Sequence, residues 1–560
     1  MRAGACGNAR GSVRECAVDY SIAGAPGPGA KIFDCLPHLR RRLRWSSLMR
    51  DFSKDTLTIG VAGTGAMGRG IVQVMAQAGC NVLLFDAMDG AAQKARDYVA
   101  SMLAKLAEKG KLSAEQAGAM TGRMQVIGEL AGFKPCDLVI EVIVENLAVK
   151  KEFFAKLEAA VSDDCLLVTN TSSLSVTAIA AACKKPERVA GYHFFNPVPL
   201  MKVVEVIAGA RTAPAVCEAL MALTKRYGHA AVSTADTPGF IVNHAGRGYG
   251  TEALKILQEG VTTFHALDRI MTDAAGFRLG PCELLDLTGM DVSHPVMESI
   301  YHQYYEEPRY RPSVIGQQRK DAGLLGRKTG QGFYRHTDGK QEVFADAPLP
   351  AERPASVWLH RGDGSAEAVA AHAAAAELLG QLGAVMESGA QPSADALIVV
   401  TPLGTDATNA ALDAGVDATR TVALDTLLPL VKRRSVMTTV VTRADMRAAA
   451  HGLFGSDGVP VTLMQDSAGF AAQRILATIV NVGCDIVQQR VCSPADLDLA
   501  VTLGLSYPKG PLAFGDALGP TRVLTILKNI YTLTGDPRYR PSPWLTRRAR
   551  LGISLLTPDT

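Results

Sequence analysis

A histidine and a glutamate, His193 and Glu205, stand in two successive apolar stretches of this 560-residue chain. The glutamate lies within residues 203–207, where burying a carboxylate is costly unless it is paired or hydrogen-bonded. His193 is the nearest ionisable group on a neighbouring predicted strand. A glutamate that holds one imidazole nitrogen leaves the other nitrogen free to act as a base. Either residue alone would be an ordinary core histidine or edge glutamate, but together, beside a dinucleotide site, they predict a catalytic dyad.

The dinucleotide site is predicted from residues 57–86, which read as strand, Gly-x-Gly-x-x-Gly turn, helix, second strand and terminal acid. Gly63 permits the tight turn, Gly65 lets the backbone approach a pyrophosphate, and Gly68 lets the helix pack closely on the strand. The pyrophosphate would then lie on free N–H groups at the helix N-terminus. Asp86 is placed to accept hydrogen bonds from the ribose hydroxyls. Its charge would repel a 2′-phosphate and no arginine follows it, so the segment predicts NAD rather than NADP.

The first half of the chain alternates predicted strands with helices, which indicates a mostly parallel, doubly wound α/β (Rossmann) sheet. Ligands of such sheets bind at the carboxyl ends of the strands, where Asn170, Ser172 and His193 fall. Between about residues 236 and 336 only helices are predicted. The strands are expected at 57–62, 81–86, 136–143, 166–170, 188–194 and 203–207, the last being the final strand of this half.

The second half holds a partial βαβ pattern and a repeat. Strands are expected at 396–401, 436–442 and 461–464, but the turn at residues 402–405 has no glycine-rich motif and cannot cradle a pyrophosphate, so this region is interpreted as structural. Residues 466–470 match 236–240 at an offset of 230, and further matches continue to residue 542. The chain therefore contains a duplicated helical domain.

Three stretches of the chain resemble the 3-hydroxyacyl-CoA dehydrogenase family: residues 170–174, 193–206 and 236–243. The resemblance implies that His193 is the general base, Glu205 its partner, and that Ser172 and Asn243 hydrogen-bond around the reacting oxygen. It also implies a reduced Rossmann-like insert before the second helical copy, as in longer dehydrogenases of this kind. By the same matching, Glu145, Lys150, Ser172 and Asn196 lie near the nicotinamide half of NAD, and Lys109 is either a CoA-phosphate contact or a solvated lysine.

These observations predict five regions. They are a disordered basic extension (1–53), an NAD-binding Rossmann domain (54–235), a helical domain (236–336), a linker with a reduced Rossmann-like domain (337–465) and a second helical copy (466–560). Only one active site is expected, because Gln473 stands where the first copy has Asn243. The two helical copies are expected to pack on each other within a monomer, and the alternative is a homo-oligomer.

Composition narrows the class of protein. The net charge is +3, which implies no nucleic-acid or membrane partner, and no apolar run is long enough to span a bilayer. The eleven cysteines include no Cys-x-x-Cys pair, so reduced thiols in a cytoplasm are expected rather than a disulfide framework or a metal site.

The activity implied is NAD-dependent oxidation of an (S)-3-hydroxyacyl-CoA in fatty-acid β-oxidation or short-chain acyl-CoA metabolism. The alternatives are 3-hydroxyadipyl-CoA oxidation in aromatic catabolism and a non-catalytic NAD-binding scaffold. A hydroxyacid dehydrogenase with a catalytic lysine ranks lower, because no lysine stands in such a motif.

Overall fold

The computed structural model describes residues 51–53 and 56–559. The predicted disordered extension, 1–53, lies outside the described residues apart from its last three, of which Phe52 is buried. The first half forms an eight-stranded sheet with the order β3-β2-β1-β4-β5-β6-β7-β8. Its strands are β1 (Thr58–Ala62), β2 (Asn81–Phe85), β3 (Met124–Val126), β4 (Leu138–Glu141), β5 (Leu166–Thr169), β6 (Val189–Phe194), β7 (Val203–Ala208) and β8 (Ala230–Ala235).

All neighbouring strands of this sheet run parallel except β6 and β7. The antiparallel pair places His193 directly opposite Glu205. Two strands differ from the sequence-based expectation, in which the strand at 203–207 was the last. Beyond it lies β8, whose small and polar sequence AAVSTA lacks the apolar run of a buried strand, and β3 is too short to show a period.

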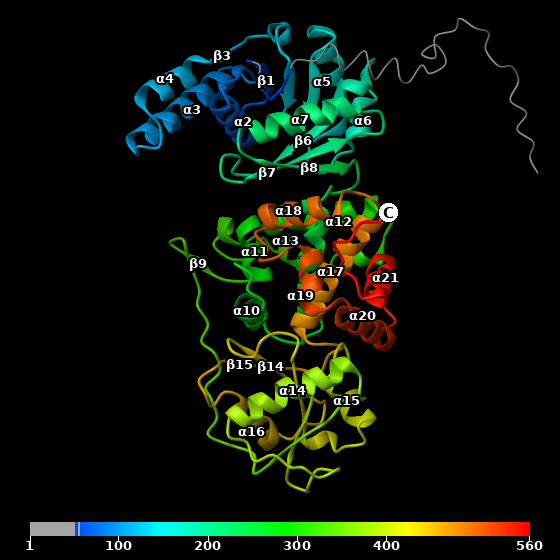
Figure 1. Ribbon diagram of the computed structural model, residues 1–560. Helices are drawn as coiled ribbons and strands as arrows, with labels where there is room; N and C mark the ends of the chain where they lie inside the picture. The colour runs from blue at the N-terminus through cyan, green and yellow to red at the C-terminus, as the bar shows by residue number, and fades with distance from the viewer. Residues whose placement is uncertain (1–50, 54–55, 560) are drawn as a thin grey trace, which may run out of the picture. The chain divides into compact units, whose positions relative to one another are not determined.

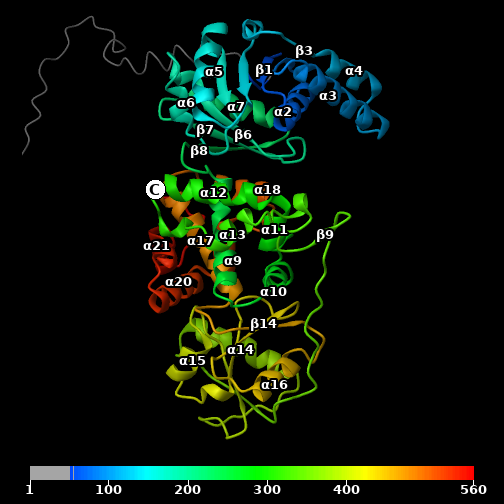
Figure 2. The same ribbon diagram turned by 180° about the vertical axis from the view of Figure 1, so that it is seen from behind.

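Helices cover both faces of the sheet, with α2 and α7 on one face and α5 and α6 on the other (Figures 1 and 2). Asp236, just after β8, accepts hydrogen bonds from the Val176 and Thr177 N–H groups at the start of α6. This contact ties the end of the sheet to the helix beside it. The helices are α2 (Ala66–Gln77), α3 (Ala91–Glu108), α4 (Ala114–Gly122), α5 (Leu147–Ala160), α6 (Val176–Ala180) and α7 (Pro214–Arg226).

Two helical copies follow, separated in sequence by the insert. The first contains α8 (Val242–Ala245), α9 (Arg247–Gln258), α10 (Phe264–Arg269), α11 (Pro281–Thr288), α12 (Met290–Gln303) and α13 (Val314–Asp321). The second contains α17 (Ala471–Gln488), α18 (Pro494–Leu505), α19 (Pro511–Leu518), α20 (Pro520–Thr534) and α21 (Pro543–Leu551). Helix α17 is buried along almost its whole length and packs on α9, so both copies share one hydrophobic core (Figure 2).

Reciprocal contacts join the two copies. The Arg309 side chain donates to the Arg540 carbonyl oxygen at 2.9 Å, and the Arg538 side chain donates to the Arg311 carbonyl oxygen at 2.6 Å. Arg309 and Arg538 are equivalent residues of the repeat, as are Arg311 and Arg540. Each copy therefore offers the same surface to the other, as the two halves of an isologous dimer do.

The insert is a five-stranded sheet with the order β11-β12-β13-β14-β15, in which only β13 and β14 are antiparallel. This is the pattern of β4 to β8 in the first sheet, so the insert repeats the second half of the Rossmann domain and lacks counterparts of β1 to β3. The missing half is the one that carries the glycine-rich turn. The insert contains β11 (Val357–Leu359), α14 (Ala366–Gln381), β12 (Leu397–Val400), α15 (Ala407–Asp413), β13 (Thr421–Leu424), β14 (Arg434–Thr438), α16 (Ala444–Phe454) and β15 (Val461–Met464).

The expected pattern of the insert was incomplete: β11 and β13 were not predicted, and the strand expected at 436–442 ends at Thr438. Both missed strands are short. A hairpin of β9 (His336–Thr337) and β10 (Lys340–Gln341) precedes the insert. Short helices complete the chain: the 3₁₀ helices η2 (Leu130–Phe133), η3 (Pro186–Arg188), η5 (Pro308–Tyr310), η6 (Arg327–Thr329), η7 (Ala418–Arg420) and η8 (Pro537–Tyr539), and the π-helix η4 (Ile270–Ala274).

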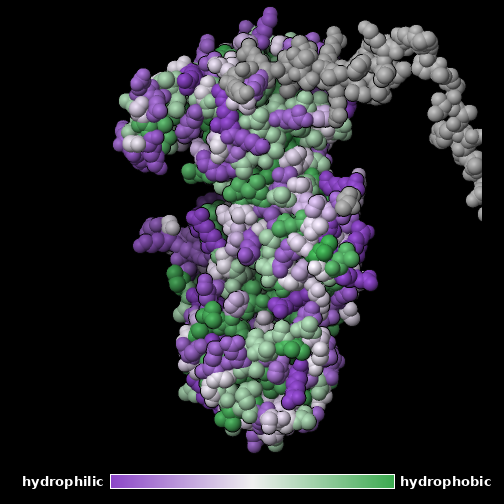
Figure 3. All heavy atoms as spheres, in the orientation of Figure 1, coloured by the Kyte–Doolittle hydropathy of each residue, from purple (hydrophilic) through white to green (hydrophobic). Residues whose placement is uncertain are grey.

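Hydrophilic and hydrophobic residues are interspersed over the face drawn in Figure 3. In the part of the chain that the structure describes, no helix is both long and apolar enough to cross a membrane.

Candidate active site

The glycine-rich turn between β1 and α2 is built for close backbone approach. Gly63 has φ +95°, and a Cβ there would lie 2.4 Å from the Val142 carbonyl oxygen. A Cβ on Gly68 would lie 2.0 Å from the Gly63 carbonyl oxygen. Gly65 is the N-cap of α2 and faces open space, with no side chain capping the helix. The first N–H groups of α2 are therefore positioned to bind a pyrophosphate.

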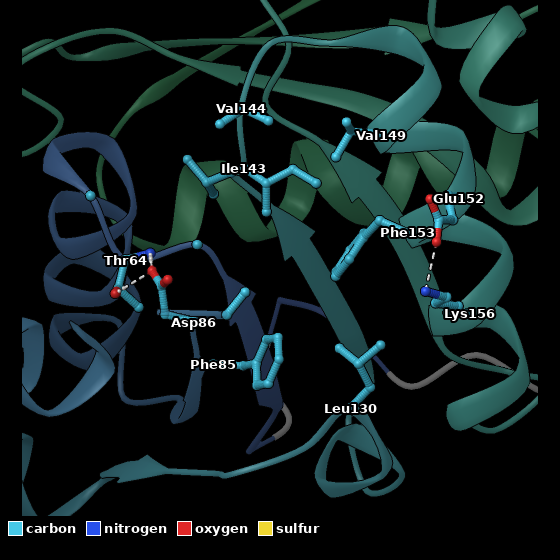
Figure 4. Close-up of a pocket in the computed structure, with 14 residues that line it drawn as sticks. Thr64, Phe85, Asp86, Leu130, Ile143, Val144, Val149, Glu152, Phe153 and Lys156 are labelled. Carbon is cyan, nitrogen blue, oxygen red and sulfur yellow. Dashed lines mark hydrogen bonds and ion pairs between the residues drawn. The ribbon is translucent and has the colours of Figure 1, made fainter. Parts of the chain in front are cut away.

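Asp86 follows β2 and contacts this turn, and both line a cavity of about 550 Å³ (Figure 4). Its carboxylate accepts hydrogen bonds from the Thr64 N–H and hydroxyl, both at 2.7 Å, and from the Met88 N–H. Burial favours the neutral acid, but these hydrogen bonds outweigh burial and lower the pKa of Asp86. The acid is therefore ionised at neutral pH, and the apolar side chains of Phe85, Leu130 and Phe153 line the cavity beside it.

The predicted dyad is formed. His193 Nδ1 lies 2.6 Å from Glu205 Oε2, and both side chains are buried. The second carboxylate oxygen, Glu205 Oε1, accepts the N–H groups of Ile241 (2.9 Å) and Val242 (2.8 Å). Since an ionised carboxylate can only accept, His193 Nδ1 carries the proton and Nε2 is left as the basic nitrogen. Glu205 therefore both orients the imidazole and joins the sheet to the first helical copy.

Two aromatic rings lie beside the imidazole, and two of the predicted polar residues contact each other. The ring centroid of Phe195 lies 4.4 Å from that of His193, and Phe240 lies at 5.9 Å. Ser172, after β5, and Asn243, in α8, meet where the Asn243 side-chain amide donates to the Ser172 carbonyl oxygen at 3.5 Å. The structure thus brings these two predicted residues together from different domains.

Glu145, which is exposed, and Lys150, which is buried, belong to a polar cluster beside Ser172. One Glu145 oxygen accepts hydrogen bonds from the Thr171 hydroxyl (2.6 Å) and the Ser172 N–H (3.1 Å), and Lys150 Nζ lies 3.3 Å from the other oxygen. Burial raises the pKa of Glu145, but the hydrogen bond from the Thr171 hydroxyl and the Lys150 charge together lower it by more than burial raises it. The carboxyl group therefore stays ionised at neutral pH. Lys150 is 1% exposed and also pairs with Glu141 at 2.6 Å, so it fixes Glu145 from behind.

Two predicted residues lie apart from this cluster. Asn196 is exposed in the loop after β6. Lys109 is exposed at the C-terminal end of α3, and no described residue forms a hydrogen bond or ion pair with its ammonium group.

The insert places different residues at the positions of the dyad. By strand register, Asp425 stands where β6 has His193, and Ser435 stands where β7 has Glu205. Gln473, the counterpart of Asn243, donates to Asp425 Oδ1 at 2.9 Å. These positions of the insert therefore hold no His–Glu pair. The position that His193 has in the first sheet is occupied by a carboxyl group that accepts a hydrogen bond from the amide of Gln473.

Three supporting residues were given no role by the sequence, although Asn170 was placed at the ligand-binding end of its strand. Glu141 binds Lys150 and Thr169, Asn170 Oδ1 accepts the Phe194 N–H at 2.8 Å, and Thr171 binds Glu145. The sequence could have identified Glu141, because it is a carboxylate inside an apolar strand, as Glu205 is.

Comparison with known proteins places these features in a family. The family model for the NAD-binding domain of 3-hydroxyacyl-CoA dehydrogenase matches residues 58–237, and the model for the C-terminal domain of that enzyme matches twice, at 239–336 and 469–554. The 3-hydroxyadipyl-CoA dehydrogenase of Escherichia coli (strain K12) is 36% identical over 494 residues, which are 88% of this chain and 98% of the relative.

Other relatives match in part or throughout. A probable 3-hydroxybutyryl-CoA dehydrogenase of Bacillus subtilis (strain 168) is 38% identical over 280 residues, 50% of this chain and 97% of its own. The crystal structure of a 3-hydroxybutyryl-CoA dehydrogenase from Escherichia coli K12 substr. MG1655 superposes with a TM-score of 0.78 at 35% identity, covering 89% of this chain and 99% of that one.

Proposed function

Since this chain belongs to the 3-hydroxyacyl-CoA dehydrogenase family and is an NAD-dependent oxidoreductase, we propose that His193 is the general base of its reaction. The observation that carries the proposal is the buried contact between His193 Nδ1 and Glu205, which leaves Nε2 basic. In this reaction an (S)-3-hydroxyacyl-CoA becomes a 3-ketoacyl-CoA. His193 Nε2 takes the hydroxyl proton, and NAD, when bound, accepts the hydride from C3.

The other residues hold groups in place. The Ser172 hydroxyl and the Asn243 amide donate hydrogen bonds to the oxygen at C3 as its charge changes. The Glu205 carboxylate stabilises the imidazolium that His193 becomes. Gly63, Gly65, Gly68 and Asp86 hold the pyrophosphate and ribose of NAD.

The remaining cofactor contacts belong to the same proposal. Glu145 and Asn196 lie toward the nicotinamide, with Lys150 acting through Glu145, and Lys109 contacts the phosphates of CoA. The lysine contact is supported only by its place in the family pattern.

The substrate class is a CoA thioester, and the relatives named above suggest two chains, 3-hydroxybutyryl and 3-hydroxyadipyl. The corresponding roles are fatty-acid β-oxidation or other short-chain acyl-CoA metabolism and the catabolism of aromatic compounds. We place the enzyme in the cytoplasm, as a monomer whose helical copies replace a dimer contact, divided at residues 53/54, 235/236, 336/337 and 465/466.

The test is His193→Ala, assayed by NADH absorbance with (S)-3-hydroxybutyryl-CoA and (S)-3-hydroxyadipyl-CoA. We expect kcat to fall roughly 10²–10⁴-fold while NAD affinity is unchanged, because general base catalysis has that typical value. His302→Ala is the matched control, since His302 is exposed and pairs only with Glu306 among the described residues. A His193→Ala enzyme that keeps more than a tenth of the wild-type rate would overturn the assignment.

A further inference from the structure

Arg247 lies one helical turn beyond Asn243 and carries a charge that the dyad does not use. Its Nε donates to the Asn243 carbonyl oxygen at 2.8 Å. Its Nη1 atom is buried, and no described residue gives that atom a hydrogen-bond partner or forms an ion pair with the side chain. Leaving a buried guanidinium nitrogen unpaired is costly, so the arrangement points to an acceptor that the chain itself does not supply.

Tyr507 faces the same place from the other helical copy. It lies between α18 and α19, is 3% exposed, and its hydroxyl is buried without a hydrogen-bond partner among the described residues. Its ring packs at 5.6 Å from Tyr249 and 5.0 Å from Phe277. The two residues come from segments in contact, because a Cβ on Gly246, next to Arg247, would lie 3.4 Å from Leu505 Cδ1, two residues before Tyr507. In keeping with this, burial raises the pKa of Tyr507 and the Arg247 charge opposes that rise. Two unpaired donors thus meet at one site.

The repeat supplies an internal comparison. At the offset of 230, Arg247 corresponds to the buried Ala477, and Tyr507 corresponds to Phe277. The fold accepts an apolar side chain at each of these positions. The polar pair therefore occurs only on the side of the molecule that has the His193–Glu205 dyad.

The positions of Asn243 and Arg247 along the chain also bring their side chains to the same side of the backbone. Asn243 and Arg247 are partly exposed, whereas His244 and Gly248, one residue further round, are buried. Asn243 belongs to α8 and Arg247 begins α9, and Gly246 between them keeps αR backbone angles (φ −62°, ψ −14°). The two side chains, four residues apart, therefore leave the backbone on the same side. Three C–C bonds of about 1.5 Å each carry a chain about 4 Å from C3, which is on the scale of one helical turn.

We propose that Arg247 and Tyr507 bind the terminal carboxylate of a dicarboxylic 3-hydroxyacyl-CoA, such as 3-hydroxyadipyl-CoA, while Asn243 holds the oxygen at C3. The proposal rests on the proposed function and specifies its substrate class. A carboxylate accepts from a guanidinium and a phenol together, and charge-assisted hydrogen bonds of this kind are strong and selective. A monocarboxylic chain of the same length would leave both donors unpaired, which a polar site penalises.

The experiment compares (S)-3-hydroxyadipyl-CoA with (S)-3-hydroxyhexanoyl-CoA, which has the same number of acyl carbons and no second carboxylate. For Arg247→Met, kcat/KM on the adipyl substrate should fall roughly 10²-fold, while that on the hexanoyl substrate stays within about threefold or rises. Tyr507→Phe should lower only the adipyl value, by roughly 3- to 10-fold. Arg447→Leu, which removes an exposed arginine of the insert, is the charge control and should change neither value.

The outcomes separate the two proposals. Equal losses on both thioesters in Arg247→Met, or a wild-type enzyme that prefers the hexanoyl substrate, would overturn carboxylate recognition and leave the role of His193 standing. Failure of the wild-type enzyme to reduce NAD with either thioester would instead refute the proposed function. If Arg247→Met does not fold, Tyr507→Phe keeps the inference testable, because it removes one hydroxyl and retains the ring.

Discussion

At the scale of single residues, Asp86 has two roles that the sequence did not separate. It organises the glycine-rich turn through Thr64, and it places a negative charge at the ribose end of the cavity. A charge held by hydrogen bonds cannot move aside for a 2′-phosphate, and like charges about 4 Å apart near a protein surface repel by roughly 4 kcal/mol.

We therefore expect the wild-type enzyme to prefer NAD over NADP by roughly 10²-fold or more in kcat/KM. Replacing Asp86 by Ser and Ala87 by Arg should narrow that ratio, at some cost in activity because Thr64 loses its acceptor. The measurement is kcat/KM for both cofactors in both proteins. Equal wild-type values would show that Asp86 does not select the cofactor.

At the scale of elements, equivalent amide residues near the start of the first helix of each copy make different contacts. In the first copy, α8 presents Asn243 to Ser172. In the second copy, Gln473 of α17 binds the Gly404 N–H, the Pro402 carbonyl oxygen and Asp425, all within the insert. In the first copy the amide has one weak hydrogen bond, whereas in the second copy the equivalent amide is held by three hydrogen bonds.

Asn243→Ala should therefore lower kcat by roughly 10²–10³-fold, as the loss of an oxyanion donor does. Gln473→Ala should leave kcat nearly unchanged and lower the free energy of unfolding by about 1–3 kcal/mol, because buried polar groups lose their partner. Steady-state kinetics and urea titration check the pair. A rate loss in Gln473→Ala as large as that in Asn243→Ala, or two NAD sites per chain in a titration, would show that the second copy is functional.

Asp425 gives the insert a pH-dependent stability. Burial raises its pKa from 3.8 to about 6 despite the hydrogen bond from Gln473. Between these two values the folded protein binds more protons than the unfolded chain, so the contribution of Asp425 to stability falls as pH rises through this window. An asparagine at position 425 has no ionisable group, so its contribution to stability would not change with pH in this way.

We expect the free energy of unfolding of Asp425→Asn minus that of the wild type to increase by about 1–2 kcal/mol when the pH is raised from about 5 to about 8. The measurement is the urea-unfolding free energy of both proteins at each pH. Taking the difference between the two proteins removes the effect of the other carboxylates. A difference that does not change with pH would mean that Asp425 titrates alike in the folded and unfolded states.

At the scale of the whole molecule, the second helical copy acts as the partner of the first. Helix α17 covers α9, and the reciprocal bonds of Arg309 and Arg538 close the contact. Residues on both sides, among them Tyr249, Ala253 and Ile479, belong to one core. Removing the second copy would expose the apolar face of α9.

Deletion of residues 466–560 should therefore make the remaining chain insoluble or drive it to dimerise through α9. Analytical ultracentrifugation and thermal unfolding check this against the full-length protein. A truncated chain that stays monomeric, soluble and as stable as the full-length protein would contradict the role given to the second copy.

The sequence by itself determined the features that depend on local spacing. The glycines and acid of residues 57–86 define a dinucleotide-binding unit, because strand, turn and helix follow one another directly. The repeat could be recognised from the sequence because its two copies keep nearly the same residue offset. His193 and Glu205 could be paired in advance, because a carboxylate in an apolar strand requires a neighbour.

Only the tertiary structure decided which distant groups meet. The pairing of β13 with β14 sets Asp425 at the position that His193 has in the first sheet, and no local pattern marks it. The burial of Lys150 between Glu141 and Glu145 depends on how α5 docks beside β4. Arg247 and Tyr507 stand 260 positions apart and lie in neighbouring segments only because the two copies pack together. Such contacts arise from packing between elements, and residue spacing along a chain carries no record of them.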